Sequence, residues 1–462
     1  MDGGPGMTEH DAGGPVGTAG LGAVARRHQH RAWYWYDWAN SAYVTTVTTV
    51  LFAPYLIAIA GEAAVDNRVQ VLGFLPVAPG ALPSYIITFS TLLSALVLPL
   101  LGAVTDRTER KKQLLAGFAW TGSAAAALLF FVTGDNWQLG AFAVIVANLC
   151  LGASVVVNDS ILCLIANEDE RDRVSSRGWA FGYLGGGLLL VVNLAMVTLH
   201  DTLGISEAMA VRASMLSAAL WWAGFTVIPF LRLRNYPPVH VVSQGGSLIQ
   251  QSFGQLMSTL RDMRNYPVTL TFLLAYLFFN DGIQTVIASS STYGSEQLGF
   301  GQGTLIATIL LVQFVGFAGA LVFGRAAGRF GARRVILAGL AVWMLIVSVA
   351  YFLPAGQVAP FLILAVAIGL VLGGTQALSR SFFSLLIPRG REAEYFSFYH
   401  AMERGTSWFG TLVFGLVYQL TDSYRPAIFA LIAFFVIGGL LLLRVDPERG
   451  IRDAGNTPPR VV

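Results

Sequence analysis

Apolar segments long enough to cross a lipid bilayer recur along the whole chain, and they constrain its fold more than any other feature. A hydrocarbon core of about 30 Å needs about 20 mostly apolar residues per helix. Backbone polar groups left unpaired in lipid are costly, so such segments cross as helices. Twelve segments qualify: residues 38–60, 84–104, 113–132, 138–166, 178–199, 209–231, 267–290, 303–324, 335–354, 359–387, 399–420 and 426–444. We therefore predict an all-α polytopic membrane protein with twelve transmembrane helices.

The composition excludes several classes of protein. Hydrophobic residues make up 55% of the chain and charged residues 12%, whereas soluble domains are about a quarter charged. A net charge of +3, without a basic tract interleaved with aromatic residues, argues against nucleic acid as a partner. The sequence contains no G-x-x-x-x-G-K-[ST], H-E-x-x-H or G-x-S-x-G motif. We expect neither an enzyme nor an ATP-driven pump, and no cofactor or metal.

The loops between the apolar segments differ strongly in their content of Lys and Arg. If the N-terminus lies inside the cell, the outer loops hold only Arg68, Arg212 and Arg425. The basic clusters, such as those in residues 107–112 and 329–334, then fall on the inner side. Inner loops of membrane proteins are enriched in Lys and Arg, so we predict that both chain ends are cytoplasmic.

Two polar tails and one polar linker divide the chain. Residues 1–31 are rich in Gly, Ala and Pro and are predicted to form a disordered cytoplasmic tail, and residues 445–462 have the same character. We expect residues 32–231 and residues 267–444 to form two six-helix bundles. Residues 232–266 join them as a cytoplasmic linker.

Apolar residues recur at helical spacing within this linker. They are Ile249, Phe253, Leu256, Leu260 and Met263. An interfacial amphipathic helix and a loosely helical linker both fit this pattern.

The two halves of the chain repeat one another. At an offset of 222 residues, "GAVTDRTERKK" (102–112) aligns with "GRAAGRFGARR" (324–334). Identical or similar residues then coincide: Gly102 with Gly324, Arg107 with Arg329, and Lys111 with Arg333. The second copy has Gly328 in place of the acid of the first. Such an offset predicts two bundles related as parallel repeats.

The first copy also matches the pattern G-x-x-x-D-R-x-G-R-K/R. The matching residues are Gly102, Asp106, Arg107, Arg110 and Lys111, with Glu109 where the pattern has Gly. With the twelve spans, this loop resembles the signature loop of the major facilitator superfamily of transporters. The resemblance implies a loop that latches the outward-facing state; the alternative is an anchor for the topology only. The Asp106 carboxylate can accept hydrogen bonds from neighbouring arginines or face the N-terminus of another helix.

Four longer blocks resemble one branch of that superfamily. They are "WYWYDWANSAY" (33–43), "RVSSRGWAFGYLGGGLLL" (173–190), "LLAYLFFNDGIQTVI" (273–287) and "GGTQALSRSFFSLLIPRGREAEYFSFY" (373–399). The branch is vacuole-effluxer-like, named for an autophagy-linked amino-acid exporter of fungal vacuoles, with many bacterial members. The resemblance implies a protein of a bacterial cytoplasmic membrane that exports a small molecule such as an amino acid.

Ionisable residues inside apolar spans are costly and therefore indicate function. Asp159 and Arg380 lie at similar depths in two spans, and the repeat offset places Arg380 opposite Asn158. In the facilitator fold these spans line one cavity, so we expect the two charges to face each other. Asp159 and Arg380 either take part in substrate binding or gating, or they form a static ion pair.

A second polar group lies near the middle of another span. Asp281 is flanked by Asn280 and Gln284, and Gln376 is a further amide expected in the same cavity. A carboxylate at this depth can carry a proton or bind an amine. The alternative is a polar contact between helices.

Residues near the inner ends of two further spans are expected to act as gate residues. Asp37 lies among aromatic residues typical of an interfacial belt, and it either caps a helix or forms a gate with Asn40. Glu403 and Arg404 are expected to be gate partners. Separately, Gly178, Gly182 and Gly186 have the small-residue spacing that permits close helix packing.

These features together predict a secondary active transporter that works by alternating access. A substrate site with both signs of charge and several amides suits a zwitterion such as an amino acid, with protons as the coupling ion. A small peptide or a polar drug would fit as well, and a receptor or scaffold that has lost transport is the other alternative. We expect a monomer in the bilayer.

Overall fold

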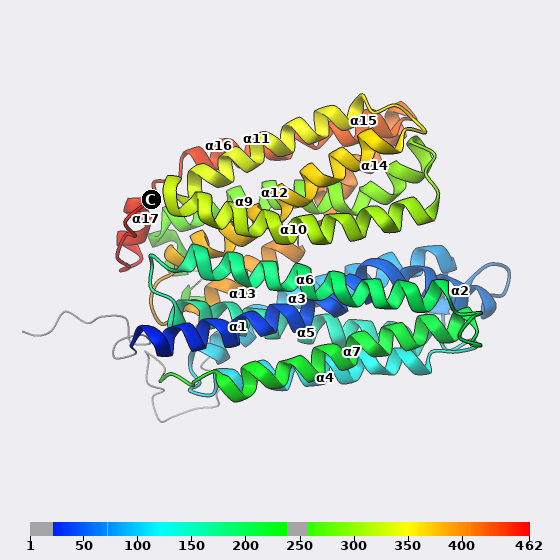
Figure 1. Ribbon diagram of the computed structural model, residues 1–462, viewed down its shortest axis with the longest axis horizontal. Helices are drawn as coiled ribbons and strands as arrows, with labels where there is room; N and C mark the ends of the chain where they lie inside the picture. Colours follow the sequence, from blue (N-terminus) through cyan, green and yellow to red (C-terminus); the bar gives the residue numbers. More distant parts are fainter. Residues whose placement is uncertain (1–21, 72, 238–256, 260, 406) are drawn as a thin grey trace, which may run out of the picture.

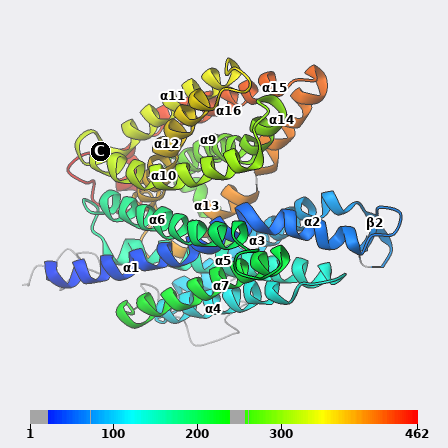
Figure 2. The same ribbon diagram turned by 45° about the vertical axis from the view of Figure 1, so that its right-hand side comes forward.

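The computed structural model describes residues 22–462 except 72, 238–256, 260 and 406. These residues form two helical bundles that lie side by side in both views (Figures 1 and 2). The linker positions 249, 253, 256 and 260 lie outside the described residues. The linker prediction is therefore open, although Met263 is buried in η4 (Met263–Asn265).

The N-terminal bundle contains the predicted spans in order. Its helices are α1 (Ala23–Tyr43), continued by η1 (Val44–Leu51) and α2 (Phe52–Glu62), then α3 (Leu82–Asp106), α4 (Lys111–Ala127) with η3 (Leu128–Phe131), α5 (Trp137–Ile165), α6 (Arg171–Thr198) and α7 (Glu207–Arg232). A hairpin of β1 (Val69–Val71) and β2 (Leu75–Val77), paired antiparallel, and a turn η2 (Pro79–Ala81) join α2 to α3.

The C-terminal bundle follows the same plan. Its helices are α9 (Pro267–Thr292) with η5 (Tyr293–Gln297), α10 (Gln302–Phe330), α11 (Ala332–Tyr351), α12 (Val358–Leu385), α13 (Glu392–Gly405), α14 (Ser407–Thr421), α15 (Tyr424–Ala430) and α16 (Ile432–Leu443). Gly331 joins α10 to α11 with a φ of 85°, a conformation that favours glycine.

Eleven helical segments in the described part of the chain are long and apolar enough to cross a membrane. Of the remaining predicted span, residues 399–405 lie in α13 and residues 407–420 in α14, and residue 406 is not described. The chain is thus an all-helical polytopic membrane protein.

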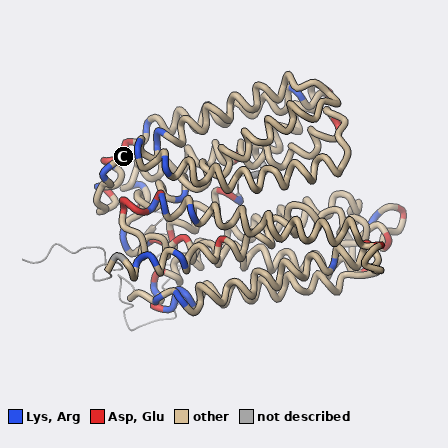
Figure 3. Tube along the Cα trace, in the orientation of Figure 1, with Lys and Arg blue, Asp and Glu red and all other residues tan. Residues whose placement is uncertain are grey.

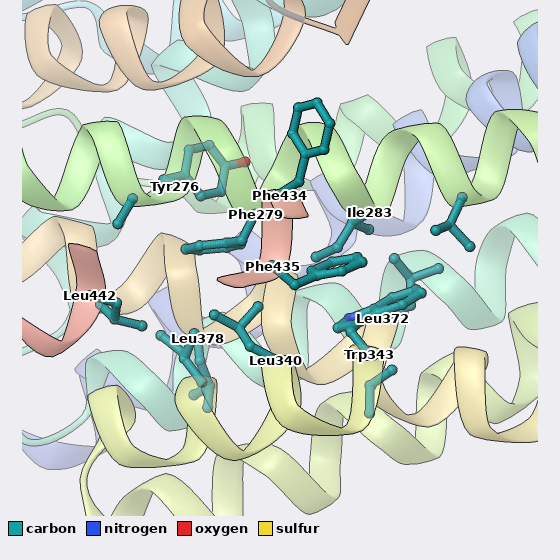
Figure 4. Packing of buried hydrophobic residues seen from close by; sticks show 14 of the residues in the cluster. Tyr276, Phe279, Ile283, Leu340, Trp343, Leu372, Leu378, Phe434, Phe435 and Leu442 are labelled. Atoms are coloured by element: carbon teal, nitrogen blue, oxygen red, sulfur yellow. The ribbon is translucent and has the colours of Figure 1, made fainter. Parts of the chain in front are cut away.

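Each bundle has its own apolar core. In the C-terminal bundle Trp343 stacks on Phe435, with their ring centroids 5.7 Å apart, and Phe279 and Ile283 pack nearby (Figure 4). Cys163 of the N-terminal bundle also belongs to this core, because the tip of α5 reaches the C-terminal bundle. The two bundles therefore share apolar contacts at one end.

That end carries most of the Lys and Arg (Figure 3). It holds the α3–α4 turn, the α10–α11 turn at Gly331, the start of α1 and the C-terminus, and we call it the basic end. The prediction that both chain ends lie on one side agrees with this arrangement of the described residues.

The two predicted tails are more ordered than expected. Helix α1 begins at Ala23, so the boundary at residue 31 is wrong. The polar residues 23–31 are helical because their side chains bond to other helix ends: Gln29 Nε2 donates to Arg232 O, and a ring nitrogen of His30 lies 2.8 Å from Ile165 O.

The C-terminal residues likewise fold back onto the basic end. They form α17 (Pro447–Asp453). Asp446 is its N-cap, and the Asp446 side chain accepts a hydrogen bond from Arg449 N–H. Ile451 is fully buried, and Asn456 Nδ2 donates to Leu385 O and Ile387 O, both at 2.8 Å. Our expectation of a disordered tail after residue 445 was wrong because these contacts fix it.

Helices of the two bundles cross closely near the basic end. Helix α3 packs along α13, and α6 packs along α10 and α12. Residues 371–385 of α12 are all buried, as are residues 392–400 of α13. The bundles are therefore closed against each other at the basic end.

Candidate functional site

Arg380 of α12 lies at the centre of a buried ionic network. Its Nη2 is 3.0 Å from Asp37 Oδ2 of α1, and its Nη1 is 3.1 Å from Asp159 Oδ1 of α5. The predicted pairing of Asp159 with Arg380 is therefore present. Both carboxylates come from the N-terminal bundle and the guanidinium comes from the C-terminal bundle, so both ion pairs cross the interface between bundles.

The remaining donors of Arg380 are also used. Nε donates to Ser175 Oγ at 2.9 Å and Nη2 donates to Ser175 O at 3.0 Å. The guanidinium lies over the ring of Trp33, 4.7 Å from its centroid, and 5.5 Å from that of Trp179. A guanidinium stays charged in proteins, so its burial requires this complete set of partners.

A histidine extends the network. His400 of α13 has Nε2 at 2.9 Å from Asp159 Oδ2 and Nδ1 at 2.9 Å from Glu403 Oε2. The side chain of Asp159 is 1% exposed, whereas those of Asp37 and Glu403 are 12% and 22% exposed. The network thus runs from Asp37 to Glu403 through a buried middle and reaches accessible space at both ends.

Close packing of α1 on α6 brings Asp37 to Arg380. A Cβ on Gly178 would collide with Asp37 Oδ2, and Cβ atoms on Gly182 and Gly186 would lie 2.6 Å from Ser41 Oγ and Thr45 Oγ1. The predicted role of these glycines in packing is therefore confirmed, with α1 as the partner.

The capping role predicted for Asp37 is wrong. Helix α1 begins at Ala23, so Asp37 lies inside the helix. The prediction that the aromatic residues around Asp37 form an interfacial belt is wrong too, because Trp33 and Tyr36 are fully buried within the protein. Asn40 is not part of the ionic network; its Nδ2 donates to Tyr36 O of its own helix.

Asn158 lies beside the network without joining its ion pairs. Its Nδ2 is 3.5 Å from Asp37 Oδ1, and its backbone carbonyl accepts from Trp33 Nε1 at 2.7 Å. Its side-chain oxygen is buried and has no partner among the described residues.

The carboxylate and amides that we predicted to share one cavity, Asn280, Asp281, Gln284 and Gln376, do not form a single cluster. Gln376 Nε2 of α12 donates to Asn280 Oδ1 of α9 at 2.8 Å. Asp281 faces α14 instead, where its Oδ2 accepts from Gly410 N–H at 2.8 Å. No hydrogen bond joins either contact to the half-buried Gln284 among the described residues. Asp281 thus accepts a hydrogen bond from a backbone N–H of α14, while its buried Oδ1 has no described partner.

The signature loop acts through one carboxylate. Asp106 accepts from Ala393 N–H at 3.0 Å and from Glu394 N–H at 2.9 Å, both in the first turn of α13, and Lys111 Nζ lies 3.0 Å away. We predicted that Asp106 either accepts bonds from neighbouring arginines or faces the N-terminus of another helix, and the structure shows the second arrangement. Since α3 and α13 belong to different bundles, this contact joins them at the basic end.

Glycine makes the approach of these helices possible. A Cβ on Gly102 would lie 2.6 Å from Ala393 O, and a Cβ on Gly324 would lie 2.5 Å from Ser176 Oγ of α6. The two repeat copies thus give equivalent close approaches across the interface.

The basic residues of the two copies differ in their contacts. Arg107 is half-buried, and Arg110 and Arg329 are exposed. Arg333 donates to Leu442 O and Leu443 O, at the end of α16 in its own bundle. The second copy therefore stabilises one bundle, and does not reproduce the contact that Asp106 makes.

The two predicted gate residues of α13 have separate neighbours. Glu403 contacts His400, as above, and Arg404 lies against α5, its Cζ 3.6 Å from the Cβ position of Gly152.

Among the described residues, no group of three or more His, Cys, Asp or Glu side chains has the geometry to hold a metal ion.

Sequence reasoning missed His400, Ser175, Trp33 and Trp179. His400 lies in "FSFYHAMER", where its spacing of three residues from Glu403 was the available signal. The two tryptophans carry no signal of their own, because stacking on Arg380 depends on how α1 and α6 cross.

Comparisons with known proteins agree on one family. The family described as "Vacuole effluxer Atg22 like" matches residues 25–455. The chain is 32% identical over 424 residues to the uncharacterized MFS-type transporter YxiO of Bacillus subtilis, covering 91% of this chain and 95% of that protein. It is 26% identical to autophagy-related protein 22 of Yarrowia lipolytica, covering 80% and 76%.

Solved structures share the fold at low identity. The proton:xylose symporter XylE superposes with a TM-score of 0.70 at 11% identity, covering 93% of this chain and 98% of that one. The transporter FucP in its outward conformation gives a TM-score of 0.65 at 13% identity, covering 92% and 99%. Both belong to the major facilitator superfamily by their descriptions or fold, so the arrangement of bundles here is the facilitator fold.

Proposed function

Because the chain belongs to the Atg22-like vacuole effluxer family of secondary transporters, we propose that it carries an amino acid or a similar zwitterion by alternating access. We further propose that it works in the direction of export and is coupled to protons. The membrane would be a bacterial cytoplasmic membrane, with the basic end on the inside.

The observation that carries this proposal is the pairing of Arg380 with Asp37 and Asp159 across the bundle interface. A zwitterion has a carboxylate that can replace an aspartate on the guanidinium and an ammonium that can pair with the aspartate it displaces. The site therefore offers complementary charges for both ends of one small molecule.

The same pairing explains why substrate and opening are linked. Separating the bundles at the basic end breaks both ion pairs, and removing the partner of a buried charge costs about 3–5 kcal/mol. A bound zwitterion supplies opposite charges to both bundles and lowers that cost. The protein then passes between its closed and open states by exchanging the ionic partners of Arg380 and the aspartates for those of the substrate, so that no buried charge is left unpaired.

Transport by purified protein in lipid vesicles tests the proposal. A mixture of isotope-labelled amino acids is offered under an imposed pH gradient, and the contents of the vesicles are identified by mass. We expect at least one amino acid to accumulate with the wild type and none with Asp159→Asn. Accumulation of dipeptides or polar drugs but no amino acid would support a peptide or multidrug facilitator, and movement of no solute would support a receptor or scaffold.

A further inference from the structure

The imidazole of His400 contacts two carboxylates, one through each ring nitrogen. Both distances, from Nε2 to Asp159 and from Nδ1 to Glu403, are 2.9 Å. An ionised carboxylate only accepts hydrogen bonds, and a neutral imidazole has a single N–H to donate. Two hydrogen bonds therefore require a proton beyond those of a neutral histidine, whether it resides on the imidazole or on a carboxylate. This triad holds one exchangeable proton.

The groups around His400 favour a positive charge there. Asp159 faces it from α5 and Glu403 from α13, while Arg380 of α12 is shared between Asp159 and Asp37 of α1. These are three carboxylates around one guanidinium, with Arg404 next to Glu403 on α13.

The other neighbours of His400 are aromatic. The ring of Tyr399 packs edge-on at 5.2 Å, and Tyr276 of α9 stacks on Tyr399 at 4.0 Å. These phenols stay neutral near pH 7, and they keep bulk water from the imidazole. The partly exposed Glu403 is then the route by which a proton reaches the triad.

Only one of the two carboxylate contacts survives separation of the bundles. Glu403 lies one turn along the same helix as His400, whereas Asp159 belongs to the other bundle. When the basic end opens, the imidazole loses Asp159 and binds its proton less tightly. By linkage, the closed state is favoured at low pH and loses this advantage as pH rises and His400 is deprotonated.

Asp281 lacks this property. Its partner, Gly410 N–H, belongs to the same bundle, so opening of the basic end leaves that contact unchanged. We propose that His400 is the proton-binding residue whose protonation closes the basic end. Its part in transport rests on the proposed function, but its effect on closure does not.

Cys163 reports on closure without any substrate. It is buried where α5 meets the C-terminal bundle, with its Sγ 4.0 Å from Ser384 O. In a Cys150→Ser background it is the remaining thiol of the chain. Its rate of reaction with N-ethylmaleimide in reconstituted vesicles, divided by the rate for denatured protein at the same pH, measures how often the basic end opens.

Histidine ordinarily titrates between about pH 5 and about pH 8. We expect the normalised rate of Cys163 to rise with pH across this range and to continue rising above it, because two carboxylates hold the proton on His400. The slope is at most about tenfold per pH unit, the limit for one proton. His400→Gln keeps one N–H donor but cannot titrate, so its rate should not depend on pH. The control is His30→Gln, which removes a buried histidine whose nitrogen contacts a backbone carbonyl, and it should respond as the wild type does.

Glu403→Gln provides a second variant that keeps His400 in place. It removes one acceptor, so the rise in labelling should move to lower pH. The proposal is overturned if His400→Gln retains the wild-type pH response, or if Glu403→Gln leaves the midpoint unchanged. Failure of amino-acid transport in vesicles with an intact labelling response would instead count against the proposed function alone.

Discussion

At the scale of single residues, Arg380 carries a charge that it cannot lose, so its burial depends on its acidic partners. Asp159 serves both Arg380 and His400 and is almost fully buried. Asp37 forms an ion pair with Arg380 and no second one among the described residues, and it is partly exposed. The two aspartates should therefore differ in how much the folded protein depends on them.

Asp159→Asn removes one of the two anionic partners of Arg380 and one of the two of His400, leaving Asp37 and Glu403. We expect a loss of about 3–5 kcal/mol in the free energy of unfolding, as for other broken buried pairs, together with loss of transport. The measurement is thermal unfolding in detergent, followed by size-exclusion chromatography. Asn40→Ala is the matched control, because the bond of the Asn40 side chain within the described part of the chain is to its own helix backbone. Equal stability of the two variants would show that the network contributes little to folding.

Asp281→Asn separates the two candidates for the coupling proton. The amide oxygen of Asn can still accept from Gly410 N–H, so the contact with α14 and the stability should be kept. If His400 binds the proton, this variant should still accumulate substrate under a pH gradient. Loss of accumulation with exchange intact would return the coupling role to Asp281, as the sequence alone suggested.

At the scale of elements, the sequence predicts the helices well and their partners less well. Apolar spans are set by local composition, and the charges of Asp159 and Arg380 stand out within them. Which aspartate reaches the guanidinium depends on how α1 crosses α6 at Gly178. The repeat predicted equivalent glycines in α3 and α10, but their partners, α13 and α6, are set only by packing of the bundles.

The crossing of α3 and α13 can be tested at its closest point. In Gly102→Ala the added methyl would meet Ala393 O and the backbone of Glu394, and backbone cannot move aside as a side chain can. We expect the helices to separate, with Cys163 labelled severalfold faster. Gly117→Ala on α4 is the control, because nothing lies within 4 Å of its Cβ position. Equal labelling of both variants would mean that α13 accommodates the methyl without opening.

At the scale of the whole molecule, the distribution of charge predicts which end faces the cytoplasm. Single cysteines replacing Asp135 or Ser423, in a background free of Cys150 and Cys163, should react with an impermeant thiol reagent added outside intact cells. A cysteine replacing Thr108 at the basic end should react only after the cells are opened. The reverse pattern would invert the proposed orientation.

The C-terminal residues connect the two bundles at the basic end. Asn456 bonds to the end of α12 and to Ile387 in the C-terminal bundle. Four residues later, Arg460 N–H donates to Asp169 Oδ1 at 2.7 Å, and Asp169 precedes α6 in the N-terminal bundle. The chain end therefore spans the interface that must separate when the basic end opens.

Removing this connection should favour opening. In a chain that ends at Gly455 the closed state loses the bond to Asp169, and a net hydrogen bond contributes about 0.5–1.5 kcal/mol. That corresponds to roughly a 2- to 13-fold rise in the labelling rate of Cys163. Asp169→Asn weakens the same bond, so it should raise labelling in the full-length chain and have no further effect in the shortened one. If the two changes instead add, the C-terminal residues act on closure by a route other than Asp169.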